Sequence, residues 1–241
     1  MNELTQRQIE ILKSLIEEYI ETAEPVGSET LEKKHNLTAS PATIRNEMVR
    51  LTNLGYLKKP HVSAGRVPTP QAMKFYVNQL MKEKDLSVTE EVGVKEKVWD
   101  LRDKEERFLK ELTRNLAQKT KALAITTTKE GDFFCAGYAN LLDMPEFFDI
   151  DITKNLFSVL DEWDYFDRLF SGDQDEDIRV LVGEELGPKL NGPYGFVYRR
   201  FKTPSGEGEI GVLGPNRLDY TYVVPTVRYF GNLIEEIAKG W

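Results

Sequence analysis

Residues 40–57 read SPATIRNEMVRLTNLGYL, and this stretch decides how the first third of the chain folds. Ser40 followed by Pro41 predicts a helix start, because a hydroxyl side chain caps a helix and proline is tolerated at the first helical position. The apolar residues that would face a core recur at helical spacing: Ile44, Met48 and Leu51. Gly55 predicts that the helix ends at about residue 53.

The opposite face of this helix, 40–53, carries short polar and basic side chains. At 100° per residue it holds Ala42, Asn46, Val49 and Asn53, flanked by Thr43, Arg45 and Arg50. One acid, Glu47, is expected at its margin. Asn and Arg can pair with base edges in the major groove of DNA, whereas Ser40, Thr43 and the helix N-terminus suit phosphate oxygens. The alternative is a solvated helix face without a partner.

Helices are also predicted before and after this one. Thr5 and Gln8 form a capping box for a helix over 5–22, and Ser28 caps a short helix that ends at His35. His35 is expected to bond carbonyls at that helix end. Residues 58–66 predict a hairpin loop, and a fourth helix is expected over 69–81. Three helices followed by a basic hairpin are the order of a winged helix-turn-helix.

The hairpin is the candidate wing. Its polar side chains that could reach DNA are Lys58, Lys59, His61, Ser63 and Arg66. Gly65 would let the chain turn sharply beside a ligand. His61 has no acid or nucleophile near it in the sequence, so it is a weak catalytic candidate.

Charge separates along the chain. The 241 residues carry a net charge of −8, but residues 39–84 hold eight basic and two acidic side chains. Residues 1–38 and 85–241 are net acidic. A basic stretch inside an acidic protein predicts a surface for a polyanion such as DNA, and the alternative is a solvated basic face.

Other classes of protein are disfavoured by composition. The sequence has one cysteine and two histidines, which do not form a Cys or His metal-binding motif. No metal and no cofactor are therefore expected. Gly-rich phosphate loops and GxSxG are missing, and the acidic run 173–177 lacks EF-hand spacing, so no enzyme is expected. No apolar run is long enough for a membrane span and no signal peptide is recognisable, which predicts a cytoplasmic protein without membrane contact.

The remainder predicts a linker and an α+β domain. Residues 85–93 are polar, and 94–121 predict one long helix that is either a coiled-coil seam between subunits or packed on its own domain. Strands are expected over 122–128, 133–139, 178–182, 195–201 and 208–213. Helices are expected over 152–170 and 222–237, the second with its firm start at Pro225. Cys135 is expected to be a small buried apolar residue.

Aromatic residues are frequent in this domain: Phe133, Phe134, Tyr138, Phe147, Phe148, Trp163, Tyr165, Phe166, Tyr194, Phe196 and Tyr198. They predict either a core or a pocket for a small molecule.

Several stretches resemble the HrcA family, the heat-inducible transcription repressors of bacteria. In the N-terminal part they are LTQRQIEILKSLIEEYIETAEPVGSETL (4–31), SPATIRNEMVRLTNLGYL (40–57) and KPHVSAGRVPTPQAMKFYV (59–77). Further on they are ANLL (139–142), PEF (145–147) and GVLGPNRLDY (211–220). The resemblance implies a winged helix-turn-helix domain (1–84), a linker (85–93) and a GAF-like domain with a mostly antiparallel sheet (94–241).

The resemblance also implies a function. Family members are dimers that bind an inverted-repeat operator ahead of chaperone genes, and the GroEL chaperonin is thought to keep them active. Carried over by position, the recognition helix is 40–53 and the wing is 58–66. The alternative is a ligand-sensing winged-helix regulator of a different regulon.

This chain departs from the family in length, being shorter by about 100 residues. The gap falls between Thr126–Thr128 and Phe133–Cys135, where a four-residue turn is predicted. In the family this region holds part of the GAF-like sheet and an inserted dimerisation module. Dimerisation of this chain is therefore expected to use another surface.

Overall fold

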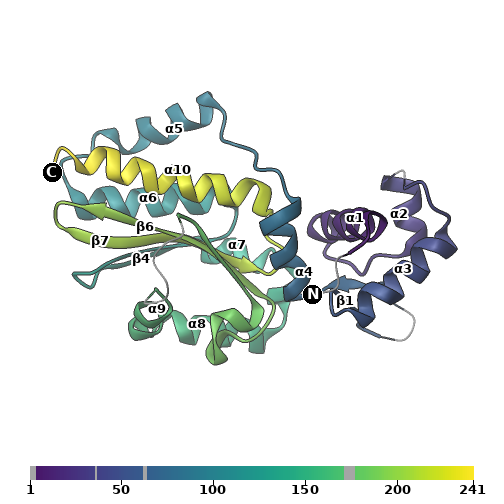
Figure 1. The fold of residues 1–241 in the computed structure, drawn as a ribbon. Coiled ribbons are helices and arrows are strands. Elements are labelled where there is room, and N and C mark those ends of the chain that lie inside the picture. The colour runs from purple at the N-terminus through teal and green to yellow at the C-terminus, as the bar shows by residue number, and fades with distance from the viewer. Residues whose placement is uncertain (1–3, 36, 62–63, 171–176) are drawn as a thin grey trace. The chain divides into compact units, whose positions relative to one another are not determined.

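A computed structural model describes residues 4–35, 37–61, 64–170 and 177–241 (Figure 1). The chain divides into two compact units, residues 1–81 and residues 82–241, and each is described by itself. Within the described residues, no helix combines the length and apolar character needed to cross a bilayer. Ser63 and the acidic run 173–176 lie outside the described residues.

The first unit is a winged helix-turn-helix. Its elements are α1 (Gln6–Thr22), α2 (Ser28–His35), α3 (Pro41–Asn53), β1 (Leu57–Lys58), β2 (Val67–Pro68), α4 (Pro70–Phe75) and a π-helical turn, η1 (Tyr76–Leu80). β1 and β2 pair antiparallel, and Val26 adds a bridge to Arg66 at the edge of this hairpin. The predicted order of helices and wing is therefore confirmed.

Local capping explains where these helices begin. Thr5 and Gln8 form the predicted capping box of α1. The Ser40 hydroxyl accepts from the Thr43 amide at 3.2 Å, with Pro41 in the first turn of α3. Thr69 caps α4 in the same way. Each cap satisfies an amide that the helix itself leaves unbonded.

The second unit is built on a five-stranded sheet. The strands are β3 (Leu123–Thr128), β4 (Phe133–Ala136), β5 (Arg179–Val182), β6 (Tyr194–Thr203) and β7 (Gly206–Pro215). Their order is β4-β3-β7-β6-β5, and every neighbouring pair is antiparallel. β6 and β7 form the longest hairpin, with Tyr194 opposite Pro215 and Thr203 opposite Gly206. The predicted α+β class with an antiparallel sheet is confirmed.

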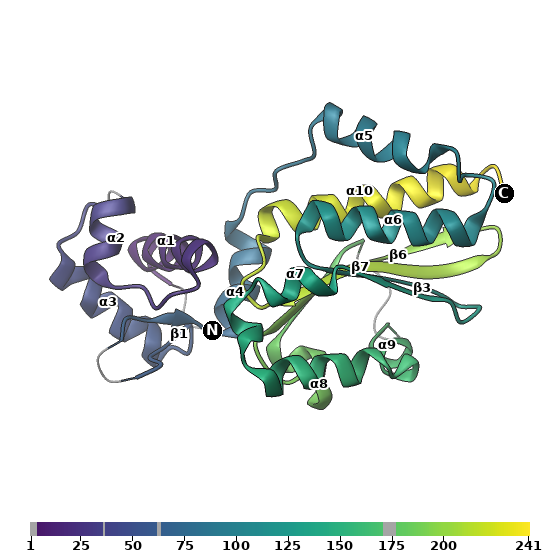
Figure 2. The ribbon, with the colours of Figure 1, turned by 180° about the vertical axis from the view of Figure 1, so that it is seen from behind.

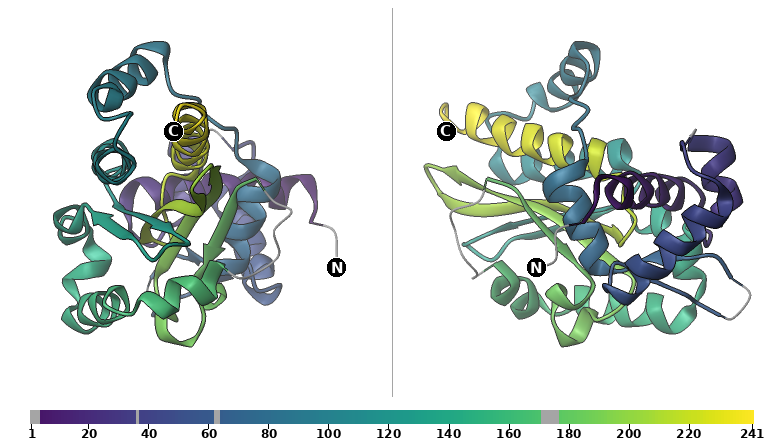
Figure 3. Two further views of the ribbon diagram at one scale, coloured as in Figure 1. Left: turned by 90° about the vertical axis from the view of Figure 1, so that its left-hand side faces the viewer. Right: turned by 45° about the vertical axis from the view of Figure 1, so that its right-hand side comes forward.

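Helices cover both faces of this sheet (Figures 1 and 2). α6 (Glu105–Thr120) and α10 (Tyr220–Ala238) lie on one face, and α5 (Val88–Trp99) packs outside them. α8 (Ile150–Leu160) and α9 (Trp163–Phe170) lie on the other face. Figure 3 shows the sheet and its covering helices from two further directions. Short connecting helices are α7 (Tyr138–Leu142), η2 (Pro145–Phe148), η3 (Gly183–Leu186) and η4 (Pro188–Leu190).

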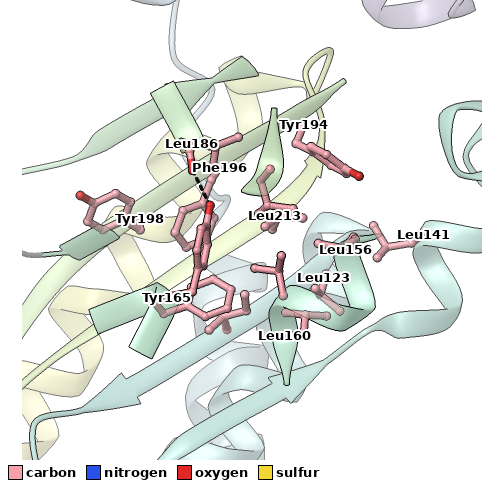
Figure 4. Packing of buried hydrophobic residues seen from close by; sticks show 14 of the residues in the cluster. Leu123, Leu141, Leu156, Leu160, Tyr165, Leu186, Tyr194, Phe196, Tyr198 and Leu213 are labelled. Carbon is pink, nitrogen blue, oxygen red and sulfur yellow. Dashed lines mark hydrogen bonds between the residues drawn. The ribbon is translucent and has the colours of Figure 1, made fainter. Parts of the chain in front are cut away.

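The aromatic residues of the second unit form a core between the sheet and α8 and α9 (Figure 4). The buried members are Phe147, Tyr165, Phe166, Tyr194, Phe196 and Tyr198. The Tyr165 hydroxyl donates to the Leu186 carbonyl, which satisfies its one polar group. Cys135 packs against this core, and burial raises the pKa of its thiol to about 11. The six buried aromatic residues therefore form core, whereas Tyr138 and Phe148 are exposed.

The prediction of a single helix over 94–121 is wrong. The chain forms α5 and α6 with a turn at 100–104, and α5 begins at Val88, inside the predicted linker. The turn reverses the chain so that Val98 and Phe108 are both buried within this unit. Leu112 and Leu116 are buried there as well, so the predicted coiled-coil seam is part of the unit's own core.

The helix predicted over 152–170 also divides, into α8 and α9, with a break at Asp161 and Glu162. The break redirects the chain so that Phe166 and Phe170 reach the aromatic core.

The closing helix begins at Tyr220, two residues before its predicted start at Tyr222, and its regular structure does not wait for Pro225. Proline has no amide hydrogen for the carbonyl four residues earlier, that of Thr221. The Lys84 amide donates to this carbonyl at 2.8 Å instead.

Candidate nucleic-acid interface

The exposed face of α3 matches the predicted one. Ala42, Arg45, Asn46, Val49, Arg50 and Asn53 are exposed, as is the capping residue Ser40, and Thr43 is half-buried. Ile44 and Leu51 have no exposed surface. The helix therefore divides into an apolar side that anchors it and a polar, basic side that is open to solvent.

Glu47 does not lie at the margin of that face. Its side chain is buried and accepts hydrogen bonds from Gln8 Nε2 at 3.0 Å and from Arg50 at 2.9 Å. Its position in the helix lies between Ile44, Met48 and Leu51, so the helical angle already places it on the core side. The exposed face of α3 consequently carries no carboxylate.

The two arginines of α3 differ in how they are held. Arg50 is bound to Glu47 through one guanidinium nitrogen, although its side chain is 67% exposed. Arg45 and Asn46 have no side-chain hydrogen bond or ion pair within the described part of the chain. Arg45 and Asn46 are therefore available to an external acceptor or donor.

The wing is attached to the rest of the unit through Arg66. Its amide and carbonyl bond Val26 at 2.9 and 2.8 Å, and its Nε donates to Thr52 Oγ1 at 3.1 Å. Lys58, Lys59 and His61 are exposed. Arg66 thus fixes the base of the wing, whereas Lys58, Lys59 and His61 face solvent.

The predicted role of Gly65 is wrong. A Cβ at this position would lie 2.3 Å from the Val26 carbonyl oxygen, and the glycine has no positive φ. Glycine is required here because two backbone segments approach closely, and not for a turn beside a ligand.

A groove of about 370 Å³ separates α3 from the wing. Its lining includes Arg45, Met48 and Val49 from α3, Lys59, Ala64, Gly65 and Arg66 from the wing, and Gly27 and Ser28 at the start of α2. Three cationic side chains, Arg45 from α3 and Lys59 and Arg66 from the wing, therefore line one concave surface, which suits a phosphate backbone.

The helix before α3 is held by Glu18. This buried carboxylate binds Lys34 at 2.6 Å and His35 at 3.3 Å. The hydrogen bond from Lys34 lowers the pKa of Glu18 below its ordinary value. The predicted role of His35 at helix carbonyls is wrong, because its ring reaches α1 instead. Periodicity does not reveal this pairing, since the partners are 17 residues apart.

Comparison with known proteins shows which family this chain belongs to. A family model described as the HrcA protein C-terminal domain matches residues 37–224, more than half of the chain. The chain belongs to the HrcA family. The resemblance seen in the sequence is confirmed, and this HrcA chain has relatives named heat-inducible transcription repressor HrcA.

Two HrcA relatives illustrate the range of similarity. The repressor from Carboxydothermus hydrogenoformans is 27% identical over 335 positions, which cover 97% of this chain and 98% of the relative. The repressor from Clostridioides difficile is 41% identical over 127 positions, which cover 53% of this chain and 38% of the relative. The first alignment has 94 more positions than the 241 residues of this HrcA chain. The chain is therefore a short member of the family.

A solved structure supports the fold. The crystal structure of a hypothetical protein at 2.2 Å resolution superposes with a TM-score of 0.79 at 19% identity, covering 99% of both chains. At that identity the match concerns the fold of this HrcA chain and not its activity.

Proposed function

We propose that this chain is a heat-inducible transcription repressor that binds DNA through α3 and the wing. The observation that carries the proposal is the exposed face of α3, which is basic, lacks a carboxylate and faces a groove shared with the wing. The proposed contact residues are Ser40, Ala42, Thr43, Arg45, Asn46, Arg50, Lys58, Lys59, His61, Ser63 and Arg66.

These residues divide into two roles. Arg45 and Asn46 read base edges, because both are exposed on the middle of α3 and no side chain of the described residues engages either of them. The small side chain of Ala42 allows α3 to approach the base pairs closely in the major groove of DNA. The remaining residues contact phosphates and set the position of α3, with Arg50 oriented by Glu47 and Arg66 holding the wing.

A dimer on an inverted repeat is part of the proposal. One recognition helix reads only one half-site, so two copies related by a two-fold axis are expected on a palindromic operator. The family resemblance supports chaperone genes as the regulon and a GroEL-type chaperonin as a partner. It also supports a cytoplasmic location, without catalytic activity.

The decisive experiment is fluorescence anisotropy of the full chain on two duplexes of equal length. One is an inverted-repeat operator of the family type, and the other is its scrambled sequence. We expect tighter binding to the operator at every salt concentration, because base contacts depend less on salt than phosphate contacts do. Equal affinity for both duplexes, with a steep loss of affinity as salt rises, would mean that α3 binds DNA non-specifically through its basic face.

The chaperonin is tested separately. Purified GroEL, added to the repressor before the operator, is expected to increase the fraction that binds DNA. Unfolded substrate protein in excess should reverse that gain. If the fraction of repressor that binds the operator does not change with GroEL, the chaperonin is not a partner. The proposal that the chain binds DNA would be unaffected by that result.

A further inference from the structure

The two edges of the sheet in the second unit differ in how their backbone groups are used. At the β5 edge, the Val182 amide donates to the Glu185 carboxylate at 2.9 Å. At the β4 edge, no described group bonds the side of the strand that faces away from β3. An open strand edge is a template for pairing with another strand, and natural proteins usually block it.

The turn at 129–132 determines which residues of β4 face outward. The Thr128 amide donates to the Asp132 carbonyl at 3.1 Å, so these two residues form a hydrogen-bonded pair. Hydrogen-bonded and non-bonded pairs alternate along an antiparallel ladder. Phe133, opposite Thr127, and Cys135, opposite Ile125, are therefore the non-bonded positions and direct their amides and carbonyls outward.

Side chains along the same edge alternate between the two faces of the sheet. Phe133 and Cys135 pack against the aromatic core, which places Phe134 on the face covered by α6. There a groove of about 400 Å³ runs beside β4, lined by Phe134, Tyr138 and the α6 residues Lys110 and Arg114. Phe134 lines this groove and is only partly buried.

An apolar patch continues from this groove. Tyr138, Leu142 and Ile150 are 45%, 53% and 73% exposed. The Tyr138 ring contacts Phe157, which lies two turns after Ile150 on the same side of α8. Of these residues, Tyr138 lines the groove beside β4, and large exposed apolar residues are typical of interaction surfaces.

We propose that β4 is the dimer interface and pairs antiparallel with β4 of a second copy of this chain. The inference rests on the proposed function, because an inverted repeat calls for two copies. The register that uses both outward-facing residues places Phe133 opposite Cys135 of the second copy. Phe134 then meets its own counterpart at the two-fold axis as a non-hydrogen-bonded pair, where side chains are closest.

This geometry is self-complementary, as a two-fold interface requires. The two Phe134 rings pack against each other, and the exposed apolar residues of α7 and α8 extend the contact. Arg114 is paired with Glu111 at 2.8 Å, which leaves Lys110 as the cation beside the axis, and salt screens the repulsion between two such lysines.

Disulfide trapping tests the register in the full chain. Cys135 is the one cysteine, so the variant Cys135→Ser/Phe134→Cys carries a single thiol at the proposed axis. We expect it to form a covalent dimer on mild oxidation. The matched control Cys135→Ser/Val92→Cys places the thiol on the exposed side of α5 and should stay monomeric on a denaturing gel. Trapping through Val92→Cys but not Phe134→Cys overturns the proposal in favour of α5.

Sedimentation equilibrium without DNA provides the second measurement. Phe134→Lys places like charges opposite each other and should weaken the dimer about tenfold or more, whereas Val92→Lys should not. A cooperative thermal transition in both variants shows that each is folded. If the parent protein sediments as a monomer, the proposal is overturned. The same holds if the monomer binds an acidic extended peptide at this strand edge instead of a second copy. Because DNA is absent, a sedimenting dimer that fails to bind the operator would contradict only the proposed function.

Discussion

Arg45 of the first unit differs from several arginines of the second unit in whether a carboxylate binds it. In the second unit, four arginines lie against carboxylates: Arg199, Arg200, Arg217 and Arg228. In the first unit, Arg45 on α3 has no such partner among the described residues and is exposed. The difference depends on where acids are placed, since the only acid of α3 is turned into the core. Arg45 is therefore open to solvent because no carboxylate of α3 lies beside it.

The largest effect is expected at the Arg217–Glu146 pair. Both side chains are nearly buried, at 14% and 11% exposure, and two nitrogens of Arg217 bond the carboxylate. Arg217→Met leaves Glu146 buried without its partner and should lower the free energy of unfolding by about 3–5 kcal/mol. Urea denaturation measures this loss. Arg114→Met is the control, because the Arg114 side chain is 55% exposed, and it should cost under about 1 kcal/mol.

The next effect concerns DNA binding without a change in stability. Arg45→Ala should weaken operator binding by about 1–3 kcal/mol if the guanidinium reads a guanine. Thermal unfolding should stay within about 0.5 kcal/mol of the parent, because no described contact is lost. Lys13→Ala removes the same charge from the exposed side of α1 and should leave operator affinity unchanged. Equal losses for both variants would mean that net charge alone binds the DNA.

A smaller effect is expected at the start of the recognition helix. Ser40→Ala removes the hydroxyl that caps the Thr43 amide and should lower stability by about 1 kcal/mol. Thr38→Ala alters an exposed hydroxyl nearby that caps nothing in the described structure and is the control. If Ser40 also contacts phosphate, operator affinity falls at temperatures where both variants are fully folded. Unchanged affinity would restrict Ser40 to a structural role.

The smallest effect is expected from acid titration of the second unit. Hydrogen bonds from the Ser87 amide, Lys119 and the Ser87 hydroxyl lower the pKa of Glu90 to about 2. Because the folded pKa lies below the ordinary 4.5, the stabilisation is present above pH 4.5 and is lost as the pH falls toward 2. Glu90→Gln should flatten the stability curve in that window. Glu96→Gln, at an exposed carboxylate on the same helix, should leave the curve as it is.

Elements that depend on neighbouring residues were predictable from the sequence. The caps at Thr5 and Ser40 and the apolar side of α3 involve residues three or four apart, so their geometry follows from the helix itself. The same holds for the turn at 129–132 between β3 and β4, where Gly131 has a positive φ.

Contacts between distant segments were not predictable in this way. The break between α5 and α6 arises because both helices bury apolar residues within one unit. Gln8 and Glu47 meet although they are 39 residues apart, and Gly65 is constrained by the Val26 backbone. No periodicity within one helix or hairpin contains that information.

By itself, the sequence determined the winged helix-turn-helix, the basic face of α3, the antiparallel sheet and the resemblance to the HrcA family. These features follow from local spacing, capping and recognisable motifs. Only the tertiary structure decided that Glu47 accepts a hydrogen bond from Gln8, that Arg66 holds the wing and that β4 is an open edge. The physical reason is that burial, counter-ion pairing and edge exposure depend on which distant segments meet, and folding alone brings those segments together.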